Sequence, residues 1–180
     1  PAIFLDRDGV INENRANYVR TWADVDIYPQ ALTALARLAQ TSHKIIVVTN
    51  QSAVGRGILT LAQANEINER LIAVVRQHGG RVDGAYICPA APHENADCRK
   101  PKPGMLLQAA AEHQLDMSQS YMVGDALTDI AAGRNAGVKE AFLLRTGRGK
   151  AQLDLPKAAD YEPLTIFGDL TAVVDYLFPQ

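Results

Sequence analysis

Short apolar runs of strand length recur along this chain, and they alternate with segments whose apolar residues repeat at helical spacing. The runs predict strands at residues 2–5, 44–48, 84–88, 121–123 and 140–144. The other pattern predicts a helix opened by Pro29 and further helices at residues 61–78, 104–113, 128–136 and 170–177. This alternation is typical of an α/β fold, in which a Rossmann-like parallel sheet is flanked by helices on both faces.

The composition is that of an ordinary globular chain, with 47% hydrophobic and 21% charged residues among 180. This length favours a single domain spanning residues 1–180. A net charge of −2 offers no basic field for nucleic acid. No apolar run approaches the roughly 20 residues that span a bilayer, and no secretory signal is evident. Two cysteines are too few for a disulfide scaffold, and together with the lack of a secretory signal this favours the cytoplasm. We also expect a monomer that binds neither nucleic acid nor membrane.

Two carboxylates, Asp6 and Asp8, follow the first predicted strand with one residue between them, and Gly9 comes next. The carboxyl ends of parallel strands are where open α/β sheets bind ligands. Buried like charges so close together repel each other unless a cation lies between them, and Mg²⁺ prefers carboxylate and carbonyl oxygens. The alternative is a solvated Asp-Gly turn, because both residues are common in turns.

Polar groups also lie at other predicted strand ends. Thr49 and Asn50 follow the second strand, Asp125 follows the fourth, and Lys100 precedes the helix before that fourth strand. Parallel strands bring such groups to one edge of a sheet. The set suits phosphoryl transfer, in which a carboxylate attacks phosphorus, a lysine neutralises phosphate charge and a second carboxylate moves a proton. Each residue also has an ordinary structural reading, as a polar turn, a solvated lysine or an acidic helix start.

Four ordered motifs resemble those of the haloacid dehalogenase (HAD) superfamily, and the resemblance runs from Asp6 to about Gly147. The motifs are DRDGVI at residues 6–11, TNQS at 49–52, RKPKPG at 99–104 and GDALTD at 124–129. Together they are far more specific than any one of them alone. The match is closest to the heptose-bisphosphate phosphatase and histidinol-phosphatase subfamily. The resemblance implies a HAD-like fold whose minimal cap is a short flap with neighbouring loops.

The resemblance also implies catalytic roles. Asp6 would be the nucleophile and Asp8 the general acid and base. Asp6, the backbone carbonyl of Asp8 and the Asp125 carboxylate would hold Mg²⁺. Thr49 and Lys100 would cradle the transferred phosphate.

Three further residues belong to the same motifs. Asn50 would contribute near the phosphate, and Asp129 would orient the groups around the metal, although an acidic residue there could simply start a helix. Lys102 competes with Lys100 for the phosphate role, but the family pattern places the active lysine before the first proline.

The segment after the first motif resembles the flap of the subfamily, with Tyr18 the clearest match and one residue inserted. Arginines suit a second phosphate because their planar fork grips two oxygens, although Arg56 could equally be a surface residue in a glycine-flanked turn. Ala126 stands where the heptose enzymes tend to carry a lysine, which weakens the case for heptose bisphosphate. The expected substrate-binding residues are Asn14, Asn17, Tyr18, Asn50, Gln51, Ser52, Arg56 and Arg99.

The subfamily typically holds a structural zinc ion with Cys-x-His and Cys-x-Cys motifs before the active lysine. Here the matching positions read Cys88-Pro89-Ala90 and Ala96-Asp97-Cys98, so two of the four ligands are alanine. A structural zinc site normally needs four protein ligands, so we expect no zinc. The alternative is a site of Cys88, His93 and Cys98, completed by Asp97 or water. Without zinc, the cysteines would be ordinary buried or free thiols.

The leading prediction is an Mg²⁺-dependent phosphatase that forms an aspartyl-phosphate and acts on a sugar bisphosphate such as D-glycero-D-manno-heptose 1,7-bisphosphate. Histidinol phosphate or another small phosphomonoester is the alternative substrate, and a nucleic-acid end is disfavoured by the acidic charge balance. A non-enzymatic alternative is a phospho-accepting module similar to a response-regulator receiver. That arrangement has no obvious place for the acidic pair after Gly124.

Overall fold

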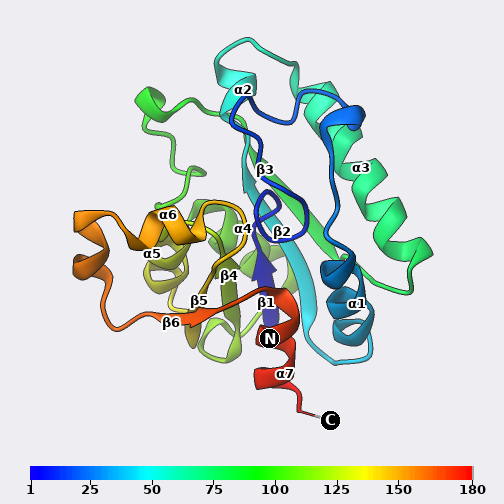
Figure 1. The fold of residues 1–180 in the computed structure, drawn as a ribbon, viewed down its shortest axis with the longest axis vertical. Coiled ribbons are helices and arrows are strands. Elements are labelled where there is room, and N and C mark those ends of the chain that lie inside the picture. Colours follow the sequence, from blue (N-terminus) through cyan, green and yellow to red (C-terminus); the bar gives the residue numbers. More distant parts are fainter. Residues whose placement is uncertain (180) are drawn as a thin grey trace.

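Six parallel strands form one sheet in the computed structural model, which describes residues 1–179. Their order is β3-β2-β1-β4-β5-β6, so the chain starts inside the sheet and builds outward first on one side and then on the other (Figure 1). The order reverses between β1 and β4, and such a switch point is where open α/β sheets bind ligands. The strands are β1 (Ala2–Leu5), β2 (Lys44–Asn50), β3 (Gly84–Cys88), β4 (Tyr121–Gly124), β5 (Glu140–Leu144) and β6 (Thr165–Phe167).

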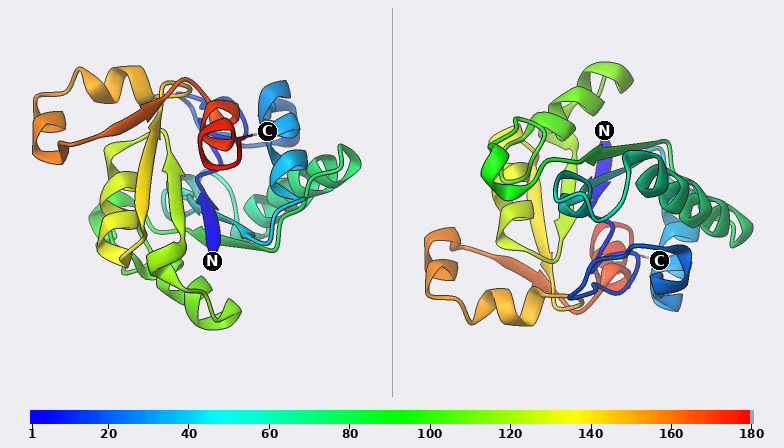
Figure 2. Two further views of the ribbon diagram at one scale, coloured as in Figure 1. Left: turned by 90° about the horizontal axis from the view of Figure 1, so that it is seen from below. Right: turned by 90° about the horizontal axis from the view of Figure 1, so that it is seen from above.

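Helices cover both faces of the sheet, which confirms the predicted fold class (Figure 2). Ile3 and Leu5 pack in a core cluster with residues of α1, α3 and α7, whereas Ala2 and Phe4 pack with residues of α4 and α5. This alternation is expected of a strand buried on both faces. None of the described helices has the length and apolar character that a membrane crossing requires. The helices are α1 (Pro29–Leu38), α2 (Ser52–Gly55), α3 (Leu61–Gln77), α4 (Gly104–His113), α5 (Leu127–Ala136), α6 (Gly149–Leu153) and α7 (Leu170–Leu177).

The register of the central strands brings the polar strand ends together. Leu5 lies opposite Val47 of β2 and Val123 of β4. The Asp6 amide then donates to the Val123 carbonyl at 2.9 Å. Asp6 and Asp125 each come directly after their strands, so both lie at the same edge of the sheet.

Some elements differ from the sequence pattern for local reasons. β2 extends to Asn50 instead of ending at Val48, because Thr49 and Asn50 continue the ladder opposite Ile87 and Cys88 of β3. The pattern does not predict β6, α2 and α6, which have three, four and five residues and are too short to show a period. Residues 12–26 form the predicted excursion, with only a short 3₁₀ turn, Trp22–Asp24, among the described residues.

The two cysteines form a disulfide, so the prediction of buried or free thiols is wrong. Cys88 ends β3, and Cys98 follows ten positions later with the two Cα atoms 5.4 Å apart. A 3₁₀ turn at Pro92–Glu94 helps bring the chain back to the end of β3, and a return of this kind leaves no periodic signal in the sequence. The bond ties the loop that carries Arg99 and Lys100 to the sheet.

The aromatic cluster around β5 yields a stability prediction. The Phe142 ring is fully buried and lies 5.8 Å from the Tyr121 ring and 5.5 Å from the Phe167 ring. Phe142→Ala should lower the free energy of unfolding in urea by about 3–5 kcal/mol, because it leaves a cavity. Leu107→Ala, at a side chain that is 47% exposed, should change it by about 0.5 kcal/mol. Equal losses in the two variants would contradict this account of the core.

Candidate active site

A tight turn after β1 positions both carboxylates of the first motif. The amides of Ile11 and Asn12 donate to the Arg7 carbonyl at 2.9 and 3.3 Å. Gly9 has a φ of +89°, a conformation that side chains rarely adopt, and a Cβ there would lie 2.1 Å from Asp125 Oδ2. Glycine is therefore required at this position, both for the turn and for the close approach of Asp125.

Asp6 lies at the floor of the site and is 5% exposed. Its Oδ1 atom lies 3.0 Å from Lys100 Nζ. Burial raises the pKa of Asp6 to about 7; the Lys100 charge opposes this, and the carboxylates of Asp129, Asp125 and Asp8 add to it. The carboxylate form thus depends on the cations around it.

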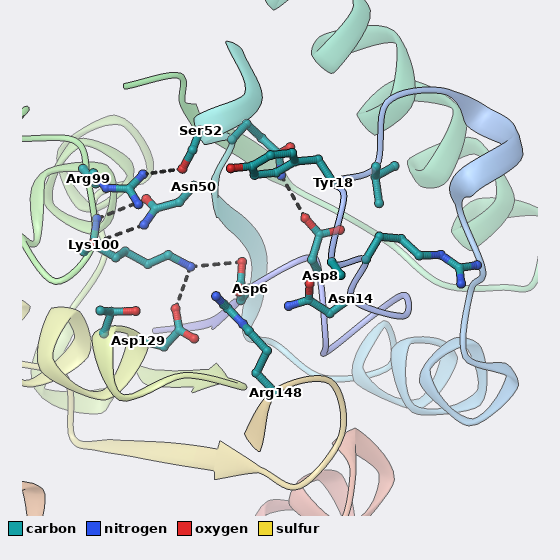
Figure 3. A pocket seen from close by; sticks show the side chains of 15 residues that line it. Asp6, Asp8, Asn14, Tyr18, Asn50, Ser52, Arg99, Lys100, Asp129 and Arg148 are labelled. Atoms are coloured by element: carbon teal, nitrogen blue, oxygen red, sulfur yellow. Dashed lines mark hydrogen bonds and ion pairs between the residues drawn. The ribbon is translucent and has the colours of Figure 1, made fainter. Parts of the chain in front are cut away.

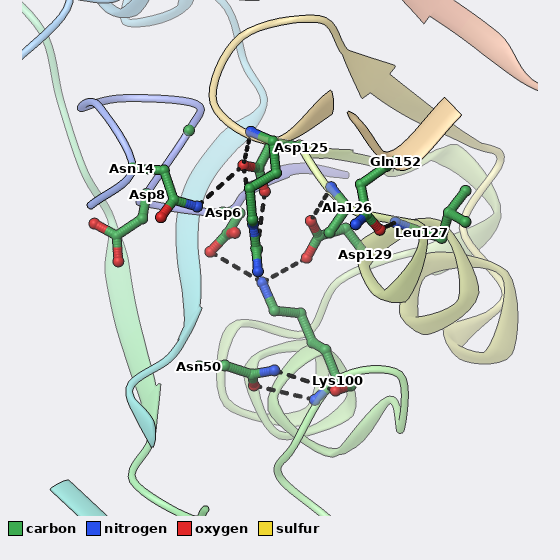
Figure 4. Close-up of polar contacts among 12 residues, drawn as sticks. Asp6, Asp8, Asn14, Asn50, Lys100, Asp125, Ala126, Leu127, Asp129 and Gln152 are labelled. Atoms are coloured by element: carbon green, nitrogen blue, oxygen red, sulfur yellow. Dashed lines mark hydrogen bonds and ion pairs between the residues drawn. The ribbon is translucent and has the colours of Figure 1, made fainter. Parts of the chain in front are cut away.

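Lys100 joins two strand ends through its side chain and its backbone (Figure 4). Nζ is 3.0 Å from Asp6 and 2.7 Å from Asp129, and it donates to the Val48 carbonyl at 2.8 Å. The Lys100 amide donates to Asn50 Oδ1 and its carbonyl accepts from Asn50 Nδ2, both at 3.1 Å. Although burial lowers it, the pKa of Lys100 is raised by the charges of Asp129 and Asp6, so the ammonium form is favoured.

Asp8 is held in a separate network of donors. Arg7 donates to both of its oxygens at 3.1 and 3.0 Å, while Asn12 and Gln51 donate at 2.8 and 3.0 Å. Burial raises the pKa of Asp8, but the Arg7 charge and these hydrogen bonds more than offset it, so the net shift is downward. Arg7 is 1% exposed and also donates to Asn68 of α3 at 2.8 Å. The sequence analysis gave no role to Arg7 or Asn68.

Three buried carboxylates face one another at the sheet edge. One oxygen from each of Asp6, Asp125 and Asp129 lies within 4.8 Å of the others. Burial raises the pKa of Asp125, the Arg148 charge opposes this, and the Asp129 charge adds to it. Hard divalent cations take carboxylate oxygens, and a cation would relieve the repulsion. The donor set therefore fits Mg²⁺ or a similar ion.

A polar cavity of about 350 Å³ opens above these groups (Figure 3). Its walls come from the flap (residues 12–26), the β2–α2 junction, the loop before α4, the start of α5 and the loop after β5. Predicted site residues that line it are Asp6, Asp8, Asn14, Tyr18, Asn50, Gln51, Ser52, Arg99, Lys100 and Asp129.

The remaining predicted residues lie elsewhere. Asp125 and Thr49 are buried below the cavity lining, and the Thr49 hydroxyl oxygen accepts from Gln51 Nε2 at 2.8 Å. Asn17 and Arg56 are exposed and do not line the cavity, so the structure does not bring them to it. Lys102 also lies away from it and pairs with Asp97 at 3.0 Å, which favours Lys100 as the lysine of the site.

Other lining residues were not predicted. Arg148 follows β5, Thr128 lies at the start of α5, and Arg15, Ala16 and Val19 belong to the flap. Arg148 lies four positions beyond the fifth predicted strand, and the sequence carries no signal that separates it from Arg145, which follows that strand directly and does not line the cavity.

Tyr18 and Arg99 shape the wall on the β2 side. Tyr18 has a φ of 65°, which is uncommon for a bulky residue and marks a locally strained backbone. Its side chain lies along the cavity (Figure 3). Arg99 Nη1 donates to Ser52 Oγ at 2.9 Å and to the Ala90 carbonyl at 3.0 Å. The wall thus presents a phenol and a fixed guanidinium to any ligand.

The fold and the site together define a HAD-like hydrolase. The profile of the HAD-hydrolase-like family matches residues 97–173, which include Lys100, Asp125 and Asp129. Asp6 and Asp8 lie outside this matched range, and their positions just after β1 place them beside Lys100, Asp125 and Asp129 at the same edge of the sheet.

Relatives narrow this class. The D-glycero-beta-D-manno-heptose-1,7-bisphosphate 7-phosphatase of Pseudomonas aeruginosa is 38% identical over 175 residues, covering 97% of this chain and 96% of the relative. The enzyme of the same name from Helicobacter pylori is 42% identical over 144 residues, or 79% and 82% of the two chains. The crystal structure of D,D-heptose 1,7-bisphosphate phosphatase from B. bronchiseptica, complexed with magnesium and phosphate, aligns over 98% of both chains at 34% identity and a TM-score of 0.89. This chain belongs to the family of heptose-bisphosphate phosphatases.

The raised pKa of Asp6 yields a pH prediction for the metal-free protein. The folded state binds this proton more tightly than the unfolded chain, whose aspartate titrates near 3.8. Stability from this group is complete below that value and is lost as the pH rises through about 7. Relative to Asp6→Asn, the free energy of unfolding of the wild type in chelating buffer should fall by on the order of 2–4 kcal/mol between about pH 4 and 8. Identical pH profiles in the two proteins would contradict the raised pKa.

Proposed function

We propose that this chain removes a phosphate from a sugar bisphosphate of the D-glycero-D-manno-heptose 1,7-bisphosphate type. The observation that carries the proposal is the buried Asp6 carboxylate, paired with Lys100 at 3.0 Å at the floor of an open polar cavity. The names of the relatives supply the substrate class. The single sheet with helices on both faces supports one domain of residues 1–180, and we propose that it acts as a monomer.

Asp6, Asp125 and the backbone carbonyl of Asp8 would hold Mg²⁺, as the carboxylate cluster and the magnesium complex of the relative support. When bound, Mg²⁺ neutralises charge on the transferring phosphate. Lys100 would neutralise charge on the same phosphate, and Asp129 holds the Lys100 ammonium in place at 2.7 Å. Asn50 holds the Lys100 backbone through two hydrogen bonds of 3.1 Å, and the buried Thr49 hydroxyl accepts from Gln51.

The chemistry proceeds in two displacements. An Asp6 oxygen forms a bond to phosphorus as the bond to the sugar oxygen breaks, and Asp8 gives that oxygen its proton. Water then attacks the aspartyl-phosphate, Asp8 takes the proton from the water, and inorganic phosphate leaves with Asp6 restored. In the free site Arg7 favours the carboxylate form of Asp8. An entering phosphate anion favours its protonation, because like charges raise a carboxyl pKa.

The substrate is held by the walls of the cavity. Tyr18 and Asn14 come from the flap, and Arg99 is fixed on Ser52 at 2.9 Å. An arginine in a defined orientation suits a second phosphate, which it can grip through two oxygens. Flap closure over a bound sugar would exclude water from the reacting phosphate.

We also propose that the activity requires no zinc. Cys88 and Cys98 are joined in a disulfide, which leaves neither sulfur free as a thiolate ligand. Metal analysis of the purified protein should find less than one zinc per chain, and stoichiometric zinc would overturn this proposal.

The nucleophile assignment gives a direct test. Asp6→Asn should lower kcat by about 10⁴-fold or more, because the amide cannot form the covalent intermediate. Circular dichroism should show an intact fold. Asp160→Asn, at an exposed residue of the chain, removes the same charge and should keep the wild-type rate. Near wild-type turnover in Asp6→Asn would refute the mechanism, and stoichiometric labelling of the wild type without turnover would indicate a receiver-like module.

Metal and substrate dependence form the second test. With Mg²⁺, phosphate release should be fastest from heptose 1,7-bisphosphate in a panel that includes histidinol phosphate and simple phosphomonoesters. A chelator should stop the reaction and added Mg²⁺ should restore it, because the buried carboxylates need a divalent cation. Phosphorus NMR would identify the phosphate that leaves. Indifference to chelator would exclude the metal role, and a preference for histidinol phosphate would replace the substrate.

A further inference from the structure

Arg148, on the loop between β5 and α6, holds Asp125 through both its backbone and its side chain. Its amide donates to Asp125 Oδ2 at 2.8 Å, Nη2 lies 3.1 Å from Oδ1, and Nε lies 3.4 Å from Oδ2. The Asp125 side chain is fully buried, whereas 52% of the Arg148 side chain is exposed. The carboxylate is therefore fixed, while the guanidinium has room to move.

The backbone beneath Arg148 is anchored to the first motif. The Thr146 hydroxyl donates to the Gly9 carbonyl at 2.6 Å. Gly147 has a φ of +54°, and a Cβ there would lie 2.5 Å from Gly9 Cα and 2.4 Å from Asp125 Oδ2. The loop is thus pressed against the carboxylate cluster. Within this loop, the Arg148 side chain can leave Asp125 without moving the backbone. Asn14, from the segment after the first motif, also donates to Asp125 Oδ2 at 3.3 Å.

The guanidinium and a metal ion compete for the same carboxylate. Arg148 contacts both oxygens of Asp125, and Asp125 is one of the three members of the acidic cluster. A divalent ion bound there needs at least one Asp125 oxygen. A guanidinium held within a few ångströms of that ion would repel it strongly in a buried site.

The same cavity offers the guanidinium another position. Arg148 lines it together with Asp6, Lys100 and Arg99, and its side chain reaches toward Asp6 (Figure 3). Arg99 is fixed on Ser52 and the Ala90 carbonyl, and Lys100 is fixed on two carboxylates. Of these three cations, Arg148 is the one that metal binding would set free.

We propose that Arg148 is an exchangeable counter-cation, which neutralises Asp125 before the metal binds, yields Asp125 to the metal and then contacts the second phosphate of the substrate. The last step rests on the proposed function, whereas the exchange with metal does not. Arg148 would thus couple loading of the metal to recognition of a bisphosphate. It is a specificity residue, and it takes no part in bond making.

Calorimetric titration of metal-free protein with Mg²⁺, without substrate, tests the exchange. Arg148→Met should bind Mg²⁺ about three- to tenfold more tightly than the wild type, because the competing cation is gone. Arg148→Lys should fall between them. Arg145→Met removes an exposed positive charge from the same loop, outside the cavity lining, and should leave the Mg²⁺ affinity within about twofold of the wild type. Unchanged or weaker Mg²⁺ binding in Arg148→Met would overturn the proposal.

Kinetics at saturating Mg²⁺ test the substrate contact. In Arg148→Met the KM for the bisphosphate should rise about tenfold, while kcat and the KM for a simple monophosphate stay near wild-type values. An equal change for both substrates would overturn the specificity role. If the wild type hydrolyses neither compound, the proposed function fails while the Mg²⁺ titration still decides the exchange. If Arg148→Met does not fold, Arg148→Lys must show the tighter Mg²⁺ binding, and its failure to do so would overturn the exchange.

Discussion

The site depends on the balance of charge around three carboxylates that the sheet buries side by side. Asp6, Asp125 and Asp129 would repel one another strongly if nothing compensated them. Lys100 bridges two of them and Arg148 holds the third. Each cation is presented by a loop packed against the sheet edge. The fold thus holds these acids close together beside two cations, and a bound metal ion would complete the compensation of their charge.

The sequence was sufficient for the parts of the site that follow directly from strand ends. Asp6, Asp8 and Asp125 come just after apolar runs, so a parallel sheet necessarily gathers them at one edge. Lys100 was a candidate from its place before the helix that leads to β4, but its preference over Lys102 rested on the ordered motifs, because its position depends on the loop from Pro89 onward. The fold class followed from the alternation of strands and helices, whereas short elements such as β6 have no period to detect.

The rest of the site was missed for physical reasons that differ. Arg148 lies on a loop whose approach to Asp125 depends on a positive φ at Gly147, which local patterning does not specify. The pairing of Cys88 with Cys98 depends on the path of an irregular loop. Asn17 was placed in the substrate site by its position in the flap, yet it is exposed and lies outside the cavity lining. Loop geometry, more than residue type, decided these cases.

The order of the strands has a consequence for how the protein is made. β1 lies between β2 and β4. The carboxyl end of β1 meets residues of β4, more than a hundred positions away in the sequence, only when β4 docks beside it. Contacts of such long sequence separation form late and slowly, because a long loop must close first. An emerging chain therefore carries Asp6 long before it holds a site, and no N-terminal fragment that lacks β4 can carry the charge balance described above. Assembly of the site in this protein thus reports the docking of β4 and of the loop after β5.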